Sequence, residues 1–181
     1  TSLRFFAAFW VFLFHLVPYW LKSDLERFPA VARVLSCGYV SVAFFYVLSG
    51  FVLFHTYSEQ IPLTMRALRV FWMKRFARLA PVFFLSIVMG APLFYVALQR
   101  AHPEGVAFFA RFLAYLGLNA AFMGAWWPES LGFNYPGWSI SVEMFFYLLF
   151  PWLAVFAKNK KRRTIWAWMG AIFVLGGCIQ L

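Results

Sequence analysis

The chain has 181 residues, of which 64% are hydrophobic, 23% aromatic and 12% charged, and its formal net charge is +10. Soluble domains are about half apolar and about a quarter charged, so this composition excludes an ordinary soluble enzyme and also a disordered chain. The two cysteines are too few for a disulfide scaffold. The composition therefore predicts an all-α protein, a polytopic bundle of transmembrane helices whose main surroundings are the lipid bilayer.

Six apolar runs approach the length of a membrane-spanning helix, which is about 20 residues for a hydrocarbon core of ~30 Å. In chain order they cover residues 3–21, 35–57, 79–98, 106–127 and 138–157, and a last run begins at residue 165. The linkers are short, and the chain begins with Thr and stops inside the last run. We therefore expect residues 1–181 to form the N-terminal part of a single transmembrane domain whose C-terminal part is missing.

Two basic clusters predict the orientation of these runs. Five Lys or Arg residues lie within 66–78 and five within 158–163, and loops rich in such residues stay in the cytoplasm. This distribution explains the positive charge without a nucleic-acid partner, and none is expected. An even number of crossings must separate the two clusters, yet three runs lie between them. We expect 106–127, which holds Arg111 and Asn119, to be partial or interfacial, and 129–137 to lie outside. The fragment would then have about five full spans.

Ionisable residues inside a span are candidates for function because they are costly to insert. Arg4 and His15 lie eleven residues apart, which places them on one helical face and about 16 Å apart along the axis. Histidine is the usual proton acceptor when a hydroxyl must be activated. The alternative is structural: Arg4 extends to the headgroups and His15 bonds to a neighbouring helix.

A pair of arginines precedes the third run. Arg75 and Arg78 lie one turn apart, before Pro81, which we expect in the first turn of that span. Two guanidinium groups on one side could bind phosphates bidentately at the inner surface. The alternative is that they bind anionic lipid headgroups or only enforce the topology.

Glu143 is the acidic candidate. It lies five residues after Trp138, about 7 Å beneath the outer end of its span, and shares a face with Ser139 and Tyr147. We expect it in the outer half of the membrane with His15, whose imidazole it would orient. The structural alternative is an ion pair with a residue such as Arg111. No metal-ligand spacing or nucleotide-binding motif accompanies these residues, so no metal site and no bound cofactor are predicted.

Four motifs occur in series along the chain. They are Leu3-Arg4 with His15, the segment 44–51 that contains Ser49-Gly50, Arg75-x-x-Arg78 with Pro81, and 138–143, which reads Trp-Ser-Ile-Ser-Val-Glu. In these motifs the sequence resembles the acyltransferase family 3 of integral-membrane O-acyltransferases, which includes bacterial cell-surface glycan O-acetylases. It departs from the usual family pattern at Phe5-Phe6, where small residues are common, and at Met144-Phe145, where Glu-Gln is common.

The resemblance implies a function and a set of roles. Such enzymes move an acyl group, usually acetyl from acetyl-CoA as co-substrate, to a hydroxyl of a glycan such as lipopolysaccharide, in the inner (cytoplasmic) membrane. Carried over residue by residue, it implies the following roles: His15 and Glu143 as catalytic residues, Arg4, Arg75 and Arg78 as acyl-donor ligands, and Ser49, Gly50, Trp138, Ser139 and Ser141 as support of the motifs. The alternatives are a proton-coupled transporter with His15 and Glu143 as a relay, and a non-catalytic membrane scaffold.

Overall fold

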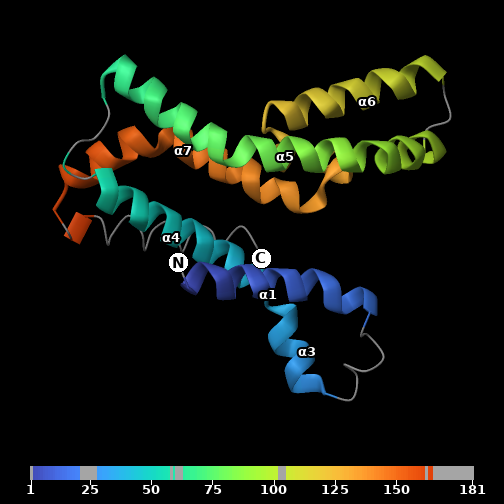
Figure 1. The fold of residues 1–181 in the computed structure, drawn as a ribbon, viewed down its shortest axis with the longest axis horizontal. Helices are drawn as coiled ribbons and strands as arrows, with labels where there is room; N and C mark the ends of the chain where they lie inside the picture. The colour runs from blue at the N-terminus through green and yellow to red at the C-terminus, as the bar shows by residue number, and fades with distance from the viewer. Residues whose placement is uncertain are drawn as a thin grey trace. The chain divides into compact units, whose positions relative to one another are not determined.

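The computed structural model describes residues 2–20, 28–57, 59, 63–101, 105–161 and 163–164, and these residues form helices and no strand. The prediction of an all-α fold is confirmed. The elements, in chain order, are α1 (Ser2–Trp20), α3 (Pro29–Ser36), α4 (Tyr39–Tyr57), α5 (Met65–Ala101), α6 (Gly105–Ala120), three 3₁₀ turns, η1 (Gly124–Trp126), η2 (Pro128–Phe133) and η3 (Tyr135–Gly137), and α7 (Trp138–Lys158) (Figure 1). The predicted run from residue 165 lies outside the described residues.

Three stretches of the described chain are long and apolar enough to cross a membrane, namely Pro29–Tyr57, Met65–Ala101 and Tyr135–Lys158. Two apolar helices are shorter, Phe5–Leu16 within α1 and Ala107–Ala120 within α6. At 1.5 Å per residue, the 16 residues of α6 reach only about 24 Å. The prediction that 106–127 falls short of a full span agrees with this length. Three of the roughly five full spans that we expected are thus found among the described residues, and the last predicted run lies outside them.

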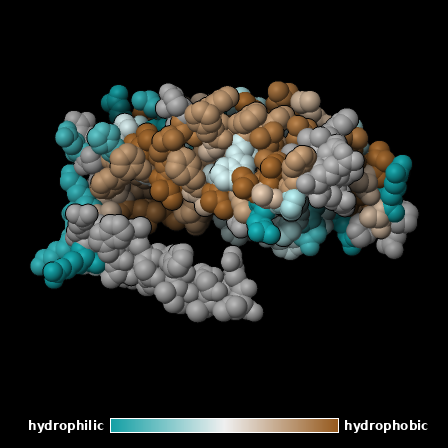
Figure 2. Space-filling model, turned by 90° about the horizontal axis from the view of Figure 1, so that it is seen from below, coloured by the Kyte–Doolittle hydropathy of each residue, from teal (hydrophilic) through white to brown (hydrophobic). Residues whose placement is uncertain are grey.

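Large apolar side chains cover much of the surface. Val47, Val88 and Leu93 are about 70% exposed or more, and Figure 2 shows hydrophobic residues over much of the face in view, with hydrophilic residues gathered in patches. Water would penalise such a surface, whereas the hydrocarbon core of a bilayer does not. The exposure therefore fits helices that face lipid or other helices, and not an aqueous surface.

The described chain divides into two units, residues 1–56 and 57–181. In the first unit the Trp10 indole N–H donates to the Val34 carbonyl over 3.1 Å and joins α1 to α3. Gly38 allows α1 to approach closely, because a Cβ there would lie 2.3 Å from the Cβ of Phe14. One indole bond and one close glycine contact thus fix α1 against the turn that precedes α4.

In the second unit, α5 differs from the predicted third span. It begins at Met65, not near Leu79, and it runs unbroken for 37 residues. The prediction that Pro81 occupies a first turn is therefore wrong, since Pro81 lies inside the helix. The basic stretch before it remains helical because Leu68 and Phe71 are buried on its inner face, and this packing offsets the backbone bond that Pro81 cannot donate.

α6 packs antiparallel to the C-terminal half of α5. Tyr95 of α5 meets Phe108 near the start of α6 with ring centroids 4.9 Å apart. Phe83, further back along α5, stacks at 4.6 Å on Phe122, just beyond the end of α6. These aromatic contacts belong to a core in which Phe83 is fully buried.

α7 packs antiparallel to the N-terminal half of α5. Its preceding residue, Gly137, lies beside the ring of Phe83, and Phe150 stacks on Phe71 at 5.6 Å. α6 and α7 therefore follow one another along a single long helix, as Figure 1 shows.

The segment between α6 and α7 folds back onto α5. Gly90 touches it so closely that a Cβ there would lie 1.8 Å from the carbonyl oxygen of Phe133. The Asn134 amide donates to the Ser86 hydroxyl over 2.7 Å. Residues 129–137, which we expected as an outer loop, thus pack against α5 at Ser86 and Gly90, and their side of the membrane stays a prediction.

α6 ends in a left-handed residue that is not glycine. Phe122 has φ 58°, and its N–H donates to Asn119 O while the N–H of Met123 donates to Leu118 O, the pair of bonds of a Schellman cap. A phenylalanine in this conformation costs of the order of 1 kcal/mol or more. The stack of Phe122 on Phe83 offsets that cost.

Candidate functional site

Arg75 turns inward from α5, in contrast to the other basic residues of this helix. Its Nη2 donates to the Tyr57 hydroxyl over 3.2 Å. Its Cζ lies 5.4 Å from the centre of the Phe71 ring, 5.7 Å from that of Tyr57 and 5.9 Å from that of Tyr147. Three aromatic faces at this distance favour a cation. The Nε of Arg75 is buried and has no hydrogen-bond partner among the described residues.

Glu143 lies on the same side of α7 as Tyr147, as the i to i+4 spacing predicts. The Tyr147 hydroxyl donates to Oε1 of Glu143. Tyr147 is only 2% exposed, and a phenol buried to that degree requires a partner. Arg75, Tyr147 and Glu143 are therefore brought together, with the tyrosine between the cation and the carboxylate.

This arrangement corrects the expected separation of the charges. We expected Arg75 at the inner surface and Glu143 in the outer half of the membrane, yet a single tyrosine bridges them. The reason is that α7 packs along the N-terminal half of α5, so Glu143 lies level with the basic stretch. The suggested partner Arg111 lies on α6, which packs along the other half of α5.

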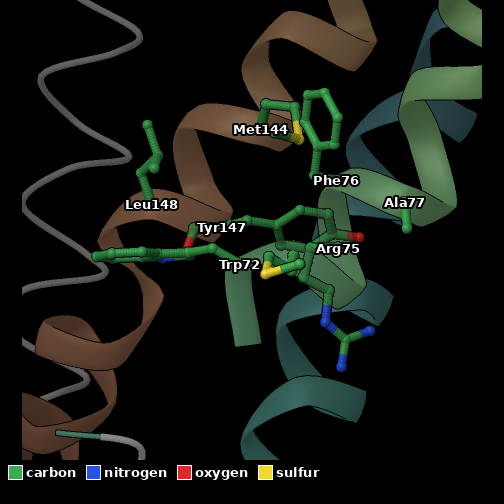
Figure 3. Close-up of a pocket in the computed structure, with 8 residues that line it drawn as sticks. Trp72, Arg75, Phe76, Ala77, Met144, Tyr147 and Leu148 are labelled. Carbon is green, nitrogen blue, oxygen red and sulfur yellow. The ribbon is translucent and has the colours of Figure 1, made fainter. Parts of the chain in front are cut away.

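A groove of about 400 Å³ lies between α5 and α7 beside these residues. Its lining is apolar apart from Arg75 and the tyrosine, and consists of Trp72, Met73, Arg75, Phe76, Ala77, Met144, Tyr147 and Leu148. Figure 3 shows the Arg75 guanidinium directed away from Phe76 and Met144, so that the cation lies to one side of the apolar walls. The groove could accept an apolar chain whose polar end lies near Arg75.

Arg78 has a different environment from Arg75. Its side chain is exposed, as are those of Arg66, Arg69 and Lys74 on the same helix. The structure therefore separates the predicted arginine pair into one residue enclosed by aromatic rings and one free to reach a ligand from the surface.

His15 lies in the first unit, on α1, with an exposed side chain. Its Nδ1 lies 2.8 Å from the carbonyl oxygen of Val11. A carbonyl oxygen only accepts, so a hydrogen bond here requires the proton on Nδ1, and the lone pair of the neutral imidazole is then on Nε2. The sequence did not predict this bond, although a backbone carbonyl four residues earlier is always within reach on a helix.

The remaining residues of the first two motifs lie on α1 and α4. Arg4 belongs to the first turn of α1, but its side chain lies outside the described set. Ser49 is half-buried, and a Cβ on the exposed Gly50 would meet no described atom within 4 Å. This face of α4 is thus open within the described part of the chain.

The serines of the last motif bond to the turn before α7. The Ser139 hydroxyl donates to Pro136 O over 2.9 Å, and that of Ser141, which is 1% exposed, to Gly137 O over 3.3 Å. Both Ser139 and Glu143 lie on α7 with the i to i+4 spacing that places them on one face, and the Ser139 hydroxyl also bonds back to the start of the helix. Trp138, half-buried, is the first residue of α7.

Two comparisons bear on this arrangement. A family model described as an acyltransferase domain matches residues 1–181, the whole chain. The chain belongs to acyltransferase family 3. Acyltransferase MdmB of Streptomyces mycarofaciens is 30% identical to this family 3 chain over 174 residues, which are 94% of the chain and 42% of that relative. The chain thus spans less than half the length of this relative. No solved structure matches it.

Proposed function

We propose that this family 3 chain is part of an inner-membrane O-acyltransferase that moves an acyl group, acetyl in the simplest case, from acyl-CoA to a hydroxyl of a glycan or similar acceptor of the cell envelope. The family match over all 181 residues supports acyl transfer. The apolar helices, long enough to cross a membrane, support a site within or beside the bilayer.

In this proposal His15 is the general base, and its bond to Val11 is the observation that carries the assignment. Because Nδ1 is engaged, Nε2 is free to take the proton of the acceptor hydroxyl. The oxygen attacks the thioester carbonyl, the C–S bond breaks, and the CoA thiolate leaves and takes up a proton. We assign to Glu143 the negative charge that would stabilise the positive imidazolium formed at this step.

The arginines form the donor end of the site. Arg78 is exposed and could bind a phosphate of the donor, and Arg75 would place its charge beside the same ligand from within the aromatic rings. Arg4 is assigned here as a further donor ligand on α1. The groove beside Arg75 is apolar and of a size that could hold the acyl or pantetheine part of the donor.

The alternative, a proton-coupled transporter with His15 and Glu143 as a relay, is not favoured. The family match and the named relative are both acyltransferases. No observation in the described part of the chain favours transport over transfer.

The test is acyl transfer by the full-length protein, purified in lipid nanodiscs and supplied with labelled acetyl-CoA and envelope glycan. We expect CoA release together with labelled glycan. His15→Ala should lower turnover by about 10²–10⁴-fold, the usual contribution of a general base, while CoA affinity is retained. His55→Ala, a histidine of α4, is the matched control and should be neutral. Wild-type turnover in His15→Ala would refute the assigned base, and ion flux without transfer would favour the transporter.

A further inference from the structure

We infer that Tyr147 is a positioning residue of the acyl-transfer site: its hydroxyl holds the Glu143 carboxylate while its ring faces the Arg75 guanidinium. One side chain thereby links the donor-binding cation to the carboxylate. The inference rests on the proposed function for what the site does. The contacts that carry it belong to α5, α7 and Tyr57, the last residue of α4.

Three parts of Tyr147 contact three different neighbours. The hydroxyl donates to Glu143, the ring centre lies 5.9 Å from Arg75 Cζ, and the carbonyl oxygen accepts from the Trp72 indole N–H over 3.2 Å. The carbonyl is free to accept because the residue four positions later is Pro151, which has no N–H to donate. Tyr147 is thus anchored by its backbone as well as by its ring.

The anchoring determines where the carboxylate lies. A glutamate on a helix has three side-chain torsions and costs conformational entropy to fix in one place. A hydrogen bond from a buried, immobile phenol to a charged oxygen is among the stronger side-chain bonds and selects one orientation. Tyr147 therefore acts on catalysis through Glu143, which its hydroxyl holds, while its ring lines the groove proposed for the donor.

The surroundings of Arg75 support its link to Tyr147 as well. One of its N–H groups bonds to Tyr57, its Nε is buried without a hydrogen-bond partner, and its charge is satisfied in part by the ring of Tyr147. A donor phosphate that binds Arg75 would meet a guanidinium group that the Tyr147 ring already holds in position. Removal of the Tyr147 hydroxyl alone should leave the contact between its ring and Arg75 intact.

Tyr147→Phe is the decisive variant, because it retains the ring for Arg75 and the carbonyl for Trp72 and removes the hydroxyl that bonds to Glu143. In the full-length protein we expect kcat to fall about 10- to 100-fold, the usual effect of a lost bond to a charged group, with KM for acetyl-CoA within about twofold of wild type. In a Glu143→Gln background, the same change should lower kcat by less than about threefold, because the charge that Tyr147 orients is absent.

Tyr95→Phe is the matched control. Tyr95 lies on α5 against Phe108 and Phe112, away from Glu143, and its change should leave both constants unaltered. Infrared difference spectra of Tyr147→Phe against wild type give a readout independent of turnover, since the carboxylate stretch of Glu143 should shift. A kcat equal to wild type, equal effects with and without Glu143, or an unshifted carboxylate band would each overturn the inference. Absence of acyl transfer in the wild type would refute the proposed function, and the infrared band would still decide whether Tyr147 holds Glu143.

Discussion

Arg75 and Arg78 lie one turn apart on α5, yet they meet different surroundings. Leu68, Phe71 and Arg75 follow the spacing of one buried helical face, so the guanidinium of Arg75 enters the contact between α5 and α7. Arg78 lies one turn beyond Arg75 on the same side of the helix, and its side chain is exposed there. In the proposed enzyme the exposed arginine is the one free to follow a phosphate, and the enclosed one supplies fixed charge.

Replacement of Arg78 tests its assignment as a donor ligand. Arg78→Ala should weaken CoA binding by about 10- to 100-fold, and Arg78→Lys should rescue only in part because a point charge lacks the two-pronged geometry. The loss should shrink at high salt, since the site is exposed. Binding is measured by isothermal titration with CoA.

Arg69→Ala is the control for this prediction, because Arg69 is also an exposed arginine of the same helix. It should leave CoA affinity unchanged. Equal losses at both positions would indicate a general attraction of the basic stretch for anions, as lipid headgroups would also produce.

At the scale of elements, two kinds of residue set the distance between helices in the second unit. Glycines permit close approach of the 124–137 segment to α5, most severely at Gly90. Prolines free backbone carbonyls, and that of Tyr147 is used to bond α7 to Trp72. Both kinds of residue weaken a helix taken alone, and both are compensated by contacts with a second element.

Gly90→Ala should destabilise the protein by about 1–3 kcal/mol, because the new Cβ would lie 1.8 Å from a backbone oxygen that cannot rotate away. Gly117→Ala on α6 is the control. A Cβ at Gly117 meets no described atom within 4 Å, and alanine is the better helix former, so stability should be unchanged or rise by up to about 1 kcal/mol. Thermal unfolding in detergent measures both, and an unaffected Gly90→Ala protein would contradict the close packing.

The bond from Trp72 to Tyr147 should depend on Pro151. Trp72→Phe removes the indole donor and should cost about 1 kcal/mol, since the Tyr147 carbonyl loses this hydrogen bond. In a Pro151→Ala background, the restored N–H at position 151 can donate to the Tyr147 carbonyl. The loss in the free energy of unfolding caused by Trp72→Phe should then be smaller. The same unfolding assay, run as a double-mutant cycle, measures the difference, and additive effects would disprove the coupling.

The whole molecule consists of two helical units, and the long α5 dominates the second. α6 and α7 return along it one after the other, which agrees with an even number of crossings between the basic clusters. The aromatic side chains of Trp126, Trp127 and Tyr135 are exposed in the connecting segment. Such residues are enriched where a membrane meets water, which supports an interfacial position for their side chains.

Single-cysteine labelling tests the orientation of the whole chain. With Cys37 and Cys178 replaced by serine, a cysteine at Lys160 should react with an impermeant reagent only after the cells are opened, because the basic cluster is expected in the cytoplasm. A cysteine at Tyr135, which is 70% exposed, should react in intact cells. Reaction of position 160 from outside would reverse the topology and refute the placement of the donor arginines on the cytoplasmic side.

Composition and local spacing determined the class of the protein and part of the site. The apolar runs predicted α1, α4 and α7 with ends close to those observed, because the length of an apolar run is a local property. The i to i+4 spacing placed Tyr147 beside Glu143 for the same reason, and the four motifs in series indicated the family that the comparison then showed.

Tertiary structure alone decided which residues of different helices are in contact. The extension of α5 back to Met65, the inward turn of Arg75 and the left-handed Phe122 each run against a local rule, and each is stabilised by a contact with a residue distant in sequence. The packing of α7 on the N-terminal half of α5 brought Glu143 level with Arg75. The membrane depths that we estimated from the ends of the predicted spans had placed these two residues far apart. Spacing along one helix fixes a face and a height on that helix only. The offset between two helices depends on the close packing of their side chains, as where Gly137 meets Phe83 and Trp72 meets the carbonyl that Pro151 leaves free.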